Sequence, residues 1–323
     1  MELLKPMNPM EPVPPSDELP TGVVPVRYTD EPRLPVNLHP NVVYDERDGE
    51  TLHLQILTPF DFMPPTPVGG ADGIAPTKYP LIVHIPGSAW HRQMVMMALS
   101  SMIRVCERGF AVAIMQYRPS EVAGFPAQIE DAKTAIRFMR KHATEYGIDP
   151  DSIAIWGDSS GGHTALMTAI TGAGTFDNGT YSEFDCDVSC VVDCFGPTDI
   201  SKMNYYPTTM DHIEPDSPEG YLIGRKNVLE HPELVAPTIV MNHITPDKRT
   251  PPIIILHGDR DQLVPFNQSC MLYDKLKALG KTVEMYKLLD GSHGAGGFNS
   301  SECLDIILEF VERYNFTRRL NNA

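Results

Sequence analysis

Short apolar runs and segments of helical period alternate along most of the chain. Residues 81–85 are continuously apolar apart from His84, which predicts a buried strand, whereas residues 125–146 repeat apolar positions at helical spacing. Further strands are expected at 51–57, 110–117, 152–156, 188–195, 253–257 and 282–288, and further helices at 94–108, 161–173, 268–279 and 304–314. This alternation predicts an α/β fold with a mainly parallel central sheet and helices on both faces.

The first 40 residues break this pattern. They hold ten of the 30 prolines of the chain, and proline removes backbone donors and fixes φ too often here for a helix or a central strand. We expect residues 1–40 to form an extended arm. It either lies on the surface of the domain or of a neighbouring subunit, as a route to a homo-oligomer, or lacks fixed structure.

A second departure lies between residues 199 and 250, where the apolar spacing is weak. We expect this stretch to be a small, lid-like insertion over the carboxyl ends of the strands, where open α/β sheets bind ligands. The predicted organisation is therefore an arm at 1–40 and one α/β domain at 41–323 that carries the insertion.

Charge and hydropathy exclude several classes of partner. The 323 residues include 42 Asp and Glu against 26 Lys and Arg, a net charge of -16, so the surface would repel nucleic acids and anionic lipid headgroups. No stretch is apolar for the roughly 18 residues that a membrane-spanning helix needs. The first 20 residues lack the basic start and apolar run of a signal peptide, although a removed leader would leave the same sequence, so the compartment stays unassigned.

The six cysteines do not predict a metal site. No two are spaced as Cys-x-x-Cys, but Cys186, Cys190 and Cys194 recur every four residues and would share one face of a helix. Valines at 188, 191 and 192 favour a buried strand instead, in which a thiol serves as a small apolar side chain. We predict neither a metal nor a cofactor.

The strongest chemical signal is the sequence Gly-Asp-Ser-Ser-Gly at residues 157–161. It follows a predicted strand and opens a predicted helix, which is the setting in which a strained turn projects a nucleophilic serine, here Ser159. A serine hydroxyl needs a base and a carboxylate to become a nucleophile. Asp259 and Asp261 follow the strand at 253–257, and His293 follows the strand at 282–288, so these groups are expected at the same sheet edge.

At these positions the chain resembles the α/β-hydrolase fold, and within it the esterases related to hormone-sensitive lipase and the bacterial feruloyl and acetylxylan esterases. The resemblance covers about residues 51–314 and includes His-Gly-x-x-Asp-x-x-Val-Pro at 257–265 and Gly-Gly-His at 161–163. It implies a catalytic triad in the order Ser159, Asp261, His293, with Asp259 at a variable position.

The resemblance also implies an oxyanion hole, although the local sequence departs from the family pattern. Hormone-sensitive-lipase relatives usually have His-Gly-Gly-Gly, whereas residues 86–89 read Pro-Gly-Ser-Ala. Because the hole is built from backbone N–H groups, the side-chain changes need not remove it. The implied donors are Ser88, Ala89 and Ser160.

Other residues receive weaker predictions. Trp90, Tyr205 and Tyr206 are the candidates to stack on an aromatic acyl group. His163 and Asp158 are expected to have structural roles, and Met94, Met96 and Met97 to lie in the core of a helix.

Together these features predict a metal-free serine carboxylesterase that acts through an acyl-enzyme on a small-molecule or carbohydrate ester. The resemblance implies short acyl or hydroxycinnamoyl esters of plant polysaccharides as substrates. Three alternatives remain: a serine peptidase of the same fold, an arylformamidase, and a non-catalytic binding protein on a hydrolase scaffold.

Overall fold

The structure is a computed structural model that describes residues 21, 24, 34–60 and 78–321, with side chains up to Asn315. The chain divides into two units, Met1–Arg33 and Leu34–Ala323, and only the second is described over most of its length. Most of the predicted arm, and residues 61–77 of the predicted loop before the strand at 81–85, lie outside the described residues.

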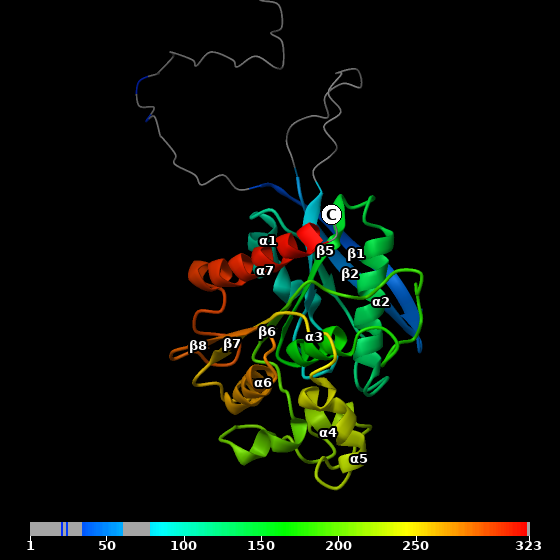
Figure 1. Cartoon of the computed structure of the whole chain (residues 1–323), viewed down its shortest axis with the longest axis vertical. Helices are drawn as coiled ribbons and strands as arrows, with labels where there is room; N and C mark the ends of the chain where they lie inside the picture. Colours follow the sequence, from blue (N-terminus) through cyan, green and yellow to red (C-terminus); the bar gives the residue numbers. More distant parts are fainter. Residues whose placement is uncertain (1–20, 22–23, 25–33, 61–77, 322–323) are drawn as a thin grey trace, which may run out of the picture. The chain divides into compact units, whose positions relative to one another are not determined.

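The second unit is built on one eight-stranded sheet in the order β1-β2-β4-β3-β5-β6-β7-β8 (Figure 1). β1 and β2 pair antiparallel, β2 also pairs antiparallel with β4, and every pairing from β4 to β8 is parallel. The strands are β1 (Val36–Arg47), β2 (Glu50–Pro59), β3 (Tyr79–Ile85), β4 (Ala111–Met115), β5 (Ile148–Asp158), β6 (Val191–Cys194), β7 (Ile253–Gly258) and β8 (Val283–Leu288). The predicted α/β-hydrolase architecture is confirmed.

Helices cover both faces of this sheet (Figure 1). α2 (Ala127–Lys141), α3 (Ser160–Thr171) and α6 (Asn267–Ala278) pack on one face, and α1 (Leu99–Cys106) and α7 (Ser301–Asn321) pack on the other. Successive residues of a strand point to opposite faces, so Leu81 and Val83 join the first core cluster while Ile82 joins the second. The central strands are therefore apolar on both sides, which explains their continuous apolar sequence.

Strand β1 corrects the boundary of the arm. It begins at Val36, so residues 36–40, which the sequence analysis assigned to the arm, belong to the sheet. The strand lies at the sheet edge, is largely exposed, and shifts register between His39 and Val42. Proline and a broken alternation are tolerated at such an edge, and both hide a strand from periodicity analysis.

The prediction that three methionines lie in a helix core is wrong. The predicted helix at 94–108 is a 3₁₀ turn, η1 (Val95–Ala98), followed by the eight-residue α1. Met94, Met96 and Met97 are 69%, 56% and 71% exposed, because the first turn faces outward before α1 reaches the sheet.

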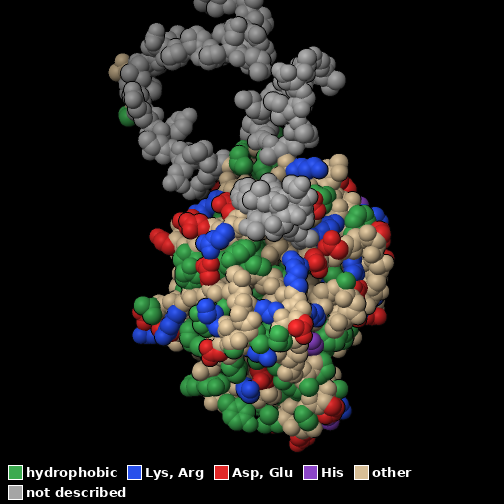
Figure 2. Space-filling view, viewed as in Figure 1, with side chains coloured by type: hydrophobic (Ala, Val, Ile, Leu, Met, Phe, Trp, Pro, Cys, Tyr) green, Lys and Arg blue, Asp and Glu red, His purple; other side chains and the backbone are tan. Residues whose placement is uncertain are grey.

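The predicted insertion lies between β6 and β7 and contains short helices only. They are η2 (Ile200–Tyr205), α4 (Pro218–Leu222), α5 (Pro232–Val235), η3 (Ala236–Thr238) and η4 (Val240–His243). A small apolar cluster joins this segment to Trp90 of the loop after β3. In Figure 2, hydrophobic side chains gather at the bottom of the view, over the insertion, and charges of both signs are interspersed above it.

Candidate active site

Ser159 lies at a sharp turn between β5 and α3, with φ 55° and ψ −127°. The two glycines of the motif are required by close approach: a Cβ at Gly157 would lie 2.1 Å from the carbonyl oxygen of Gly161, and one at Gly161 would lie 1.9 Å from that of Ile85. Only glycine lets the strand, the turn and the neighbouring strand pack this closely. The hydroxyl of Ser159 is thereby held at the carboxyl end of the sheet, in an open cavity.

The structure brings Ser159, His293 and Asp261 into one hydrogen-bonded chain. His293 Nε2 lies 3.0 Å from Ser159 Oγ, and His293 Nδ1 lies 2.8 Å from Asp261 Oδ2. Asp261 follows β7 and His293 follows β8, so adjacent parallel strands deliver the two side chains to the same edge. This arrangement matches the predicted order and leaves Nε2 in position to take the serine proton.

The carboxylate of Asp261 is fully buried and well supplied with donors. Its Oδ1 accepts the backbone N–H groups of Leu263 and Val264, each at 2.9 Å. Burial raises the pKa of Asp261, but hydrogen bonds from His257 and His293 outweigh it and hold the pKa well below its usual range. Asp261 is therefore ionised at neutral pH and fixes the Nδ1–H tautomer of His293.

Asp259, the other carboxylate of this loop, lies outside the chain of hydrogen bonds. Its Oδ1 accepts the backbone N–H of Asp290 at 2.8 Å, and its Oδ2 lies 3.8 Å from Lys287 Nζ. These contacts tie the acid loop to the loop that carries His293, which is a structural role.

The three predicted oxyanion donors are not equivalent. The N–H of Ser88 donates to Ser160 Oγ at 2.9 Å, so it is already engaged. The N–H groups of Ala89 and Ser160 have no hydrogen-bond acceptor among the described residues, and both residues line the cavity beside Ser159. Ala89 adopts a φ of 55° and Trp90 one of 57°, so this loop takes left-handed backbone conformations without glycine.

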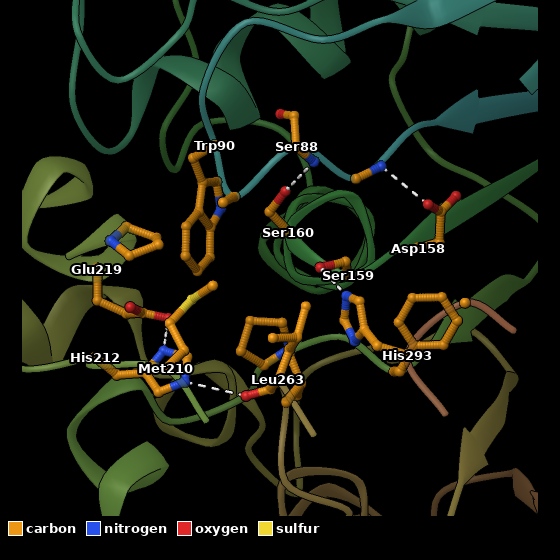
Figure 3. A pocket seen from close by; sticks show the side chains of 17 residues that line it. Ser88, Trp90, Asp158, Ser159, Ser160, Met210, His212, Glu219, Leu263 and His293 are labelled. Atoms are coloured by element: carbon orange, nitrogen blue, oxygen red, sulfur yellow. Dashed lines mark hydrogen bonds and ion pairs between the residues drawn. The ribbon is translucent and has the colours of Figure 1, made fainter. Parts of the chain in front are cut away.

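Asp158 anchors this loop from the nucleophile side (Figure 3). Its Oδ2 accepts the N–H of Gly87 at 3.0 Å, and its Oδ1 lies 2.9 Å from Nε2 of the buried His84. The residue directly before Ser159 thus holds the start of the loop that carries the oxyanion donors, in agreement with the structural role expected for it.

The cavity in front of Ser159 has a volume of about 300 Å³ and is walled partly by the insertion. Trp90 lines it as predicted, although the indole is only 1% exposed. Tyr205 and Tyr206 do not line it, and Tyr205 is 73% exposed, so their predicted contact with substrate is corrected. Lining side chains that the sequence analysis missed include Phe195, Met210, His212, Glu219, Leu263 and Val264.

Trp90 is held in place by His163. Its Nε1–H donates to His163 Nδ1 at 3.3 Å, and the opposite ring nitrogen, Nε2, lies 2.9 Å from the carbonyl oxygen of Thr238. Burial lowers the pKa of His163 to about 4, so the ring is neutral and links the cavity wall to the insertion. The packing role expected for His163 agrees with these contacts.

Within the described residues, no group of three or more His, Cys, Asp and Glu side chains is arranged to hold a metal ion. Cys186, Cys190 and Cys194 are buried, and the last lies in β6. None of the described helices is long and apolar enough to cross a membrane.

Comparison with known proteins places the chain in a family. The BD-FAE family model matches residues 73–276. Esterase LipQ of Mycobacterium tuberculosis is 27% identical over 220 residues, which make up 68% of this chain and 50% of the relative. The probable carboxylic ester hydrolase LipM of the same organism is 29% identical over 210 residues, or 64% of this chain and 47% of the relative. The chain spans about half the length of these curated relatives.

Two solved structures are also similar. A truncated form of a carbohydrate esterase from gut microbiota has 28% identity and a TM-score of 0.71, covering 89% of this chain and 99% of its own. A bifunctional GH43-CE protein of Bacteroides eggerthii has 29% identity and a TM-score of 0.71, covering 87% of this chain and 35% of its own. With the motif, the sheet and the family match in agreement, the chain belongs to the BD-FAE family and is an α/β-hydrolase that resembles the serine esterases.

Proposed function

We propose that the protein is a serine carboxylic-ester hydrolase. The observation that carries the proposal is the continuous hydrogen-bonded chain from Ser159 Oγ through His293 to the buried carboxylate of Asp261. The esterase and carboxylic-ester-hydrolase names of the relatives support the same reaction class. A binding protein would have no use for all three groups in this register.

The geometry supports the following steps. Ser159 Oγ attacks the ester carbonyl carbon while its proton passes to His293 Nε2, and the carbonyl oxygen becomes an anion that the N–H groups of Ala89 and Ser160 stabilise. Collapse of the intermediate breaks the bond to the alcohol oxygen, which takes the proton from His293. Water then attacks the acyl-enzyme with the same base and releases the carboxylic acid. Asp261 stays ionised throughout and stabilises the imidazolium.

For the substrate class, we propose acyl esters of carbohydrates, with a short acyl or hydroxycinnamoyl group. Two observations support this choice: the carbohydrate esterase from gut microbiota is similar over its whole length, and the cavity has room for one compact acyl or aryl group. The apolar side chains of Trp90, Met210 and Leu263 in the wall favour an apolar substituent.

The decisive experiment is a burst assay with a chromogenic acetate ester. The wild-type protein should release the chromophore with a stoichiometric burst, and mass spectrometry should find the acetyl group on Ser159. Ser159→Ala should abolish turnover while the melting temperature stays unchanged, whereas Ser182→Ala, at an exposed hydroxyl, should behave as wild type. Retained turnover in Ser159→Ala would contradict the esterase assignment. A feruloyl ester as second substrate tests how large an acyl group the cavity accepts.

A further inference from the structure

The wall of the cavity farthest from the triad carries a buried pair of titratable side chains, His212 and Glu219. His212 Nδ1 lies 2.9 Å from Glu219 Oε1, and His212 Nε2 lies 3.0 Å from the carbonyl oxygen of Leu263. Each residue is 2% exposed, and both line the cavity that contains Ser159. Neither belongs to the chain of hydrogen bonds that performs the proposed chemistry.

The contacts determine how many protons this pair holds. A carbonyl oxygen only accepts, so Nε2–H of His212 donates to Leu263, and a second proton lies between Nδ1 and Oε1 of Glu219. Whether that proton is on nitrogen or oxygen, the pair carries no net charge. Burial raises the pKa of Glu219. Burial alone would lower the pKa of His212, but the hydrogen bond and negative charge of Glu219 and the hydrogen bond to the carbonyl oxygen of Leu263 together raise it.

The second carboxyl oxygen of Glu219 is left without a partner. Oε2 is buried and has no hydrogen-bond donor among the described residues. A buried carboxyl oxygen without a hydrogen-bond donor destabilises the folded protein. Such an oxygen is retained where a bound ligand supplies the missing donor. Glu219 lies in the first turn of the short helix α4 (Pro218–Leu222), which belongs to the insertion.

The space between Glu219 and the nucleophile is apolar. Figure 3 shows Trp90, Met210 and Leu263 between Glu219 on one side and Ser159 and His293 on the other. A group that reaches from the serine along this cavity therefore passes an apolar wall and ends at the side chain of Glu219. This is the pattern of a pocket that selects one polar atom on an otherwise apolar substituent.

We propose that Glu219 Oε2 accepts a hydrogen bond from a hydroxyl group on the substrate substituent that fills this cavity, and that it is a specificity-determining residue with His212 as its positioning residue. This inference rests on the proposed esterase function. A neutral hydroxyl fits better than an ammonium group, because the His212–Glu219 pair is already neutral and a cation would add an uncompensated buried charge.

Kinetics with matched esters test the inference. One pair varies the acyl group, with 4-nitrophenyl 3-(4-hydroxyphenyl)propanoate against 4-nitrophenyl 3-phenylpropanoate. The other pair varies the alcohol, with 2-(4-hydroxyphenyl)ethyl acetate against 2-phenylethyl acetate.

In one of the two series, the wild-type enzyme should prefer the hydroxylated ester in kcat/KM by at least about tenfold, since the analogue without the hydroxyl leaves a buried oxygen unpaired. Glu219→Met should abolish that preference, whereas Glu230→Gln, on the exposed surface of the insertion, should keep it. Absence of a preference in both series, or a preference that survives Glu219→Met, would overturn the inference. Glu219→Leu is the second variant, because leucine also lacks an acceptor, and it should remove the preference even if the methionine variant does not fold.

A binding measurement separates failure of the inference from failure of the esterase assignment. The ketones 4-(4-hydroxyphenyl)butan-2-one and 4-phenylbutan-2-one imitate the ester pair but cannot be hydrolysed, and their dissociation constants for Ser159→Ala are measured by calorimetry. The hydroxylated ketone should bind about tenfold more tightly, and the difference should vanish when Glu219→Met is added. Equal affinities contradict the inference even if esters are hydrolysed, and a clear difference supports it even if they are not. Tighter binding of the matching aminomethyl ketone than of the phenol would show a cation site instead.

Discussion

His257 Nε2 lies 3.3 Å from Asp261 Oδ2, so the carboxylate that holds His293 also contacts a second histidine. Both His257 and Asp261 are buried at the end of β7. His257 Nε2 also lies 3.0 Å from the carbonyl oxygen of Val264, and Nδ1 lies 2.7 Å from Ser269 Oγ. His257 thus closes the acid loop on itself and fixes the direction of the carboxylate.

His257→Phe should therefore impair catalysis more than binding. Without the ring nitrogens the acid loop loses three contacts, and Asp261 no longer orients His293 as firmly. We expect kcat to fall about tenfold with little change in KM, and the free energy of unfolding to fall by about 1–3 kcal/mol. Steady-state kinetics and denaturant unfolding measure the two effects. His231→Gln, at a half-exposed ring in the insertion, is the control, and an unchanged kcat in His257→Phe would refute the positioning role.

Ser160→Ala should weaken the oxyanion hole indirectly. Ser160 Oγ accepts the N–H of Ser88 and lies 3.3 Å from the hydroxyl of Tyr117, which in turn lies 2.9 Å from Ser88 Oγ. Removing this acceptor leaves a backbone N–H unpaired and loosens the loop that presents Ala89. We expect kcat to fall about tenfold with KM nearly constant. Tyr117→Phe, which removes one hydroxyl of the network, should have a smaller effect; a kcat for Ser160→Ala at or above wild type would show that the loop holds its shape unaided.

Asp193→Asn should stabilise the protein at alkaline pH. Burial raises the pKa of Asp193 to about 8, and its Oδ2 has no partner among the described residues while Oδ1 accepts the N–H of Gly196 at 3.1 Å. The unfolded carboxyl ionises near pH 4, so wild-type stability falls as pH rises from about 4 to about 8. The amide keeps the acceptor and has no charge to bury. Unfolding free energies at pH 5 and pH 8.5 should therefore diverge in wild type and stay closer in the variant; parallel pH profiles would contradict this account.

His163→Leu should remove a loss of stability at acid pH. Burial lowers the pKa of His163 to about 4, whereas the unfolded ring titrates near 6.5, so the stabilising contribution of the neutral ring is complete above about pH 6.5 and is lost as pH falls to about 4. At pH 7 the variant should be less stable by about 1–3 kcal/mol, because Trp90 Nε1–H loses its acceptor. Thermal unfolding across pH 4–8 gives both results, and a wild-type profile with no fall below pH 6 would disprove the linkage.

Much of the fold could be predicted because its central strands are buried on both faces. Residues such as 81–83 and 253–256 are apolar without interruption, and helices of regular period separate the strands, so their order and type follow from local sequence. Edge strand β1 escaped because exposure and a register shift erase the alternation. The turn after Met94 was predicted wrongly for the opposite reason: Val95 is buried but Met96 and Met97 face outward, and composition alone does not record direction.

Chemistry that depends on short motifs could be predicted from local sequence. Ser159 needs two nearby glycines for its turn, and His293 follows a strand in a loop, so residue type and local spacing are sufficient to name these two. Local spacing left the acid open between Asp259 and Asp261, and the family resemblance chose Asp261. The tertiary structure was needed to identify the N–H groups that remain available beside Ser159 and the side chains that wall the cavity. Glu219, His212 and Leu263 meet because the insertion folds back over the sheet edge, and the energy of that packing depends on contacts between distant segments that no local pattern encodes.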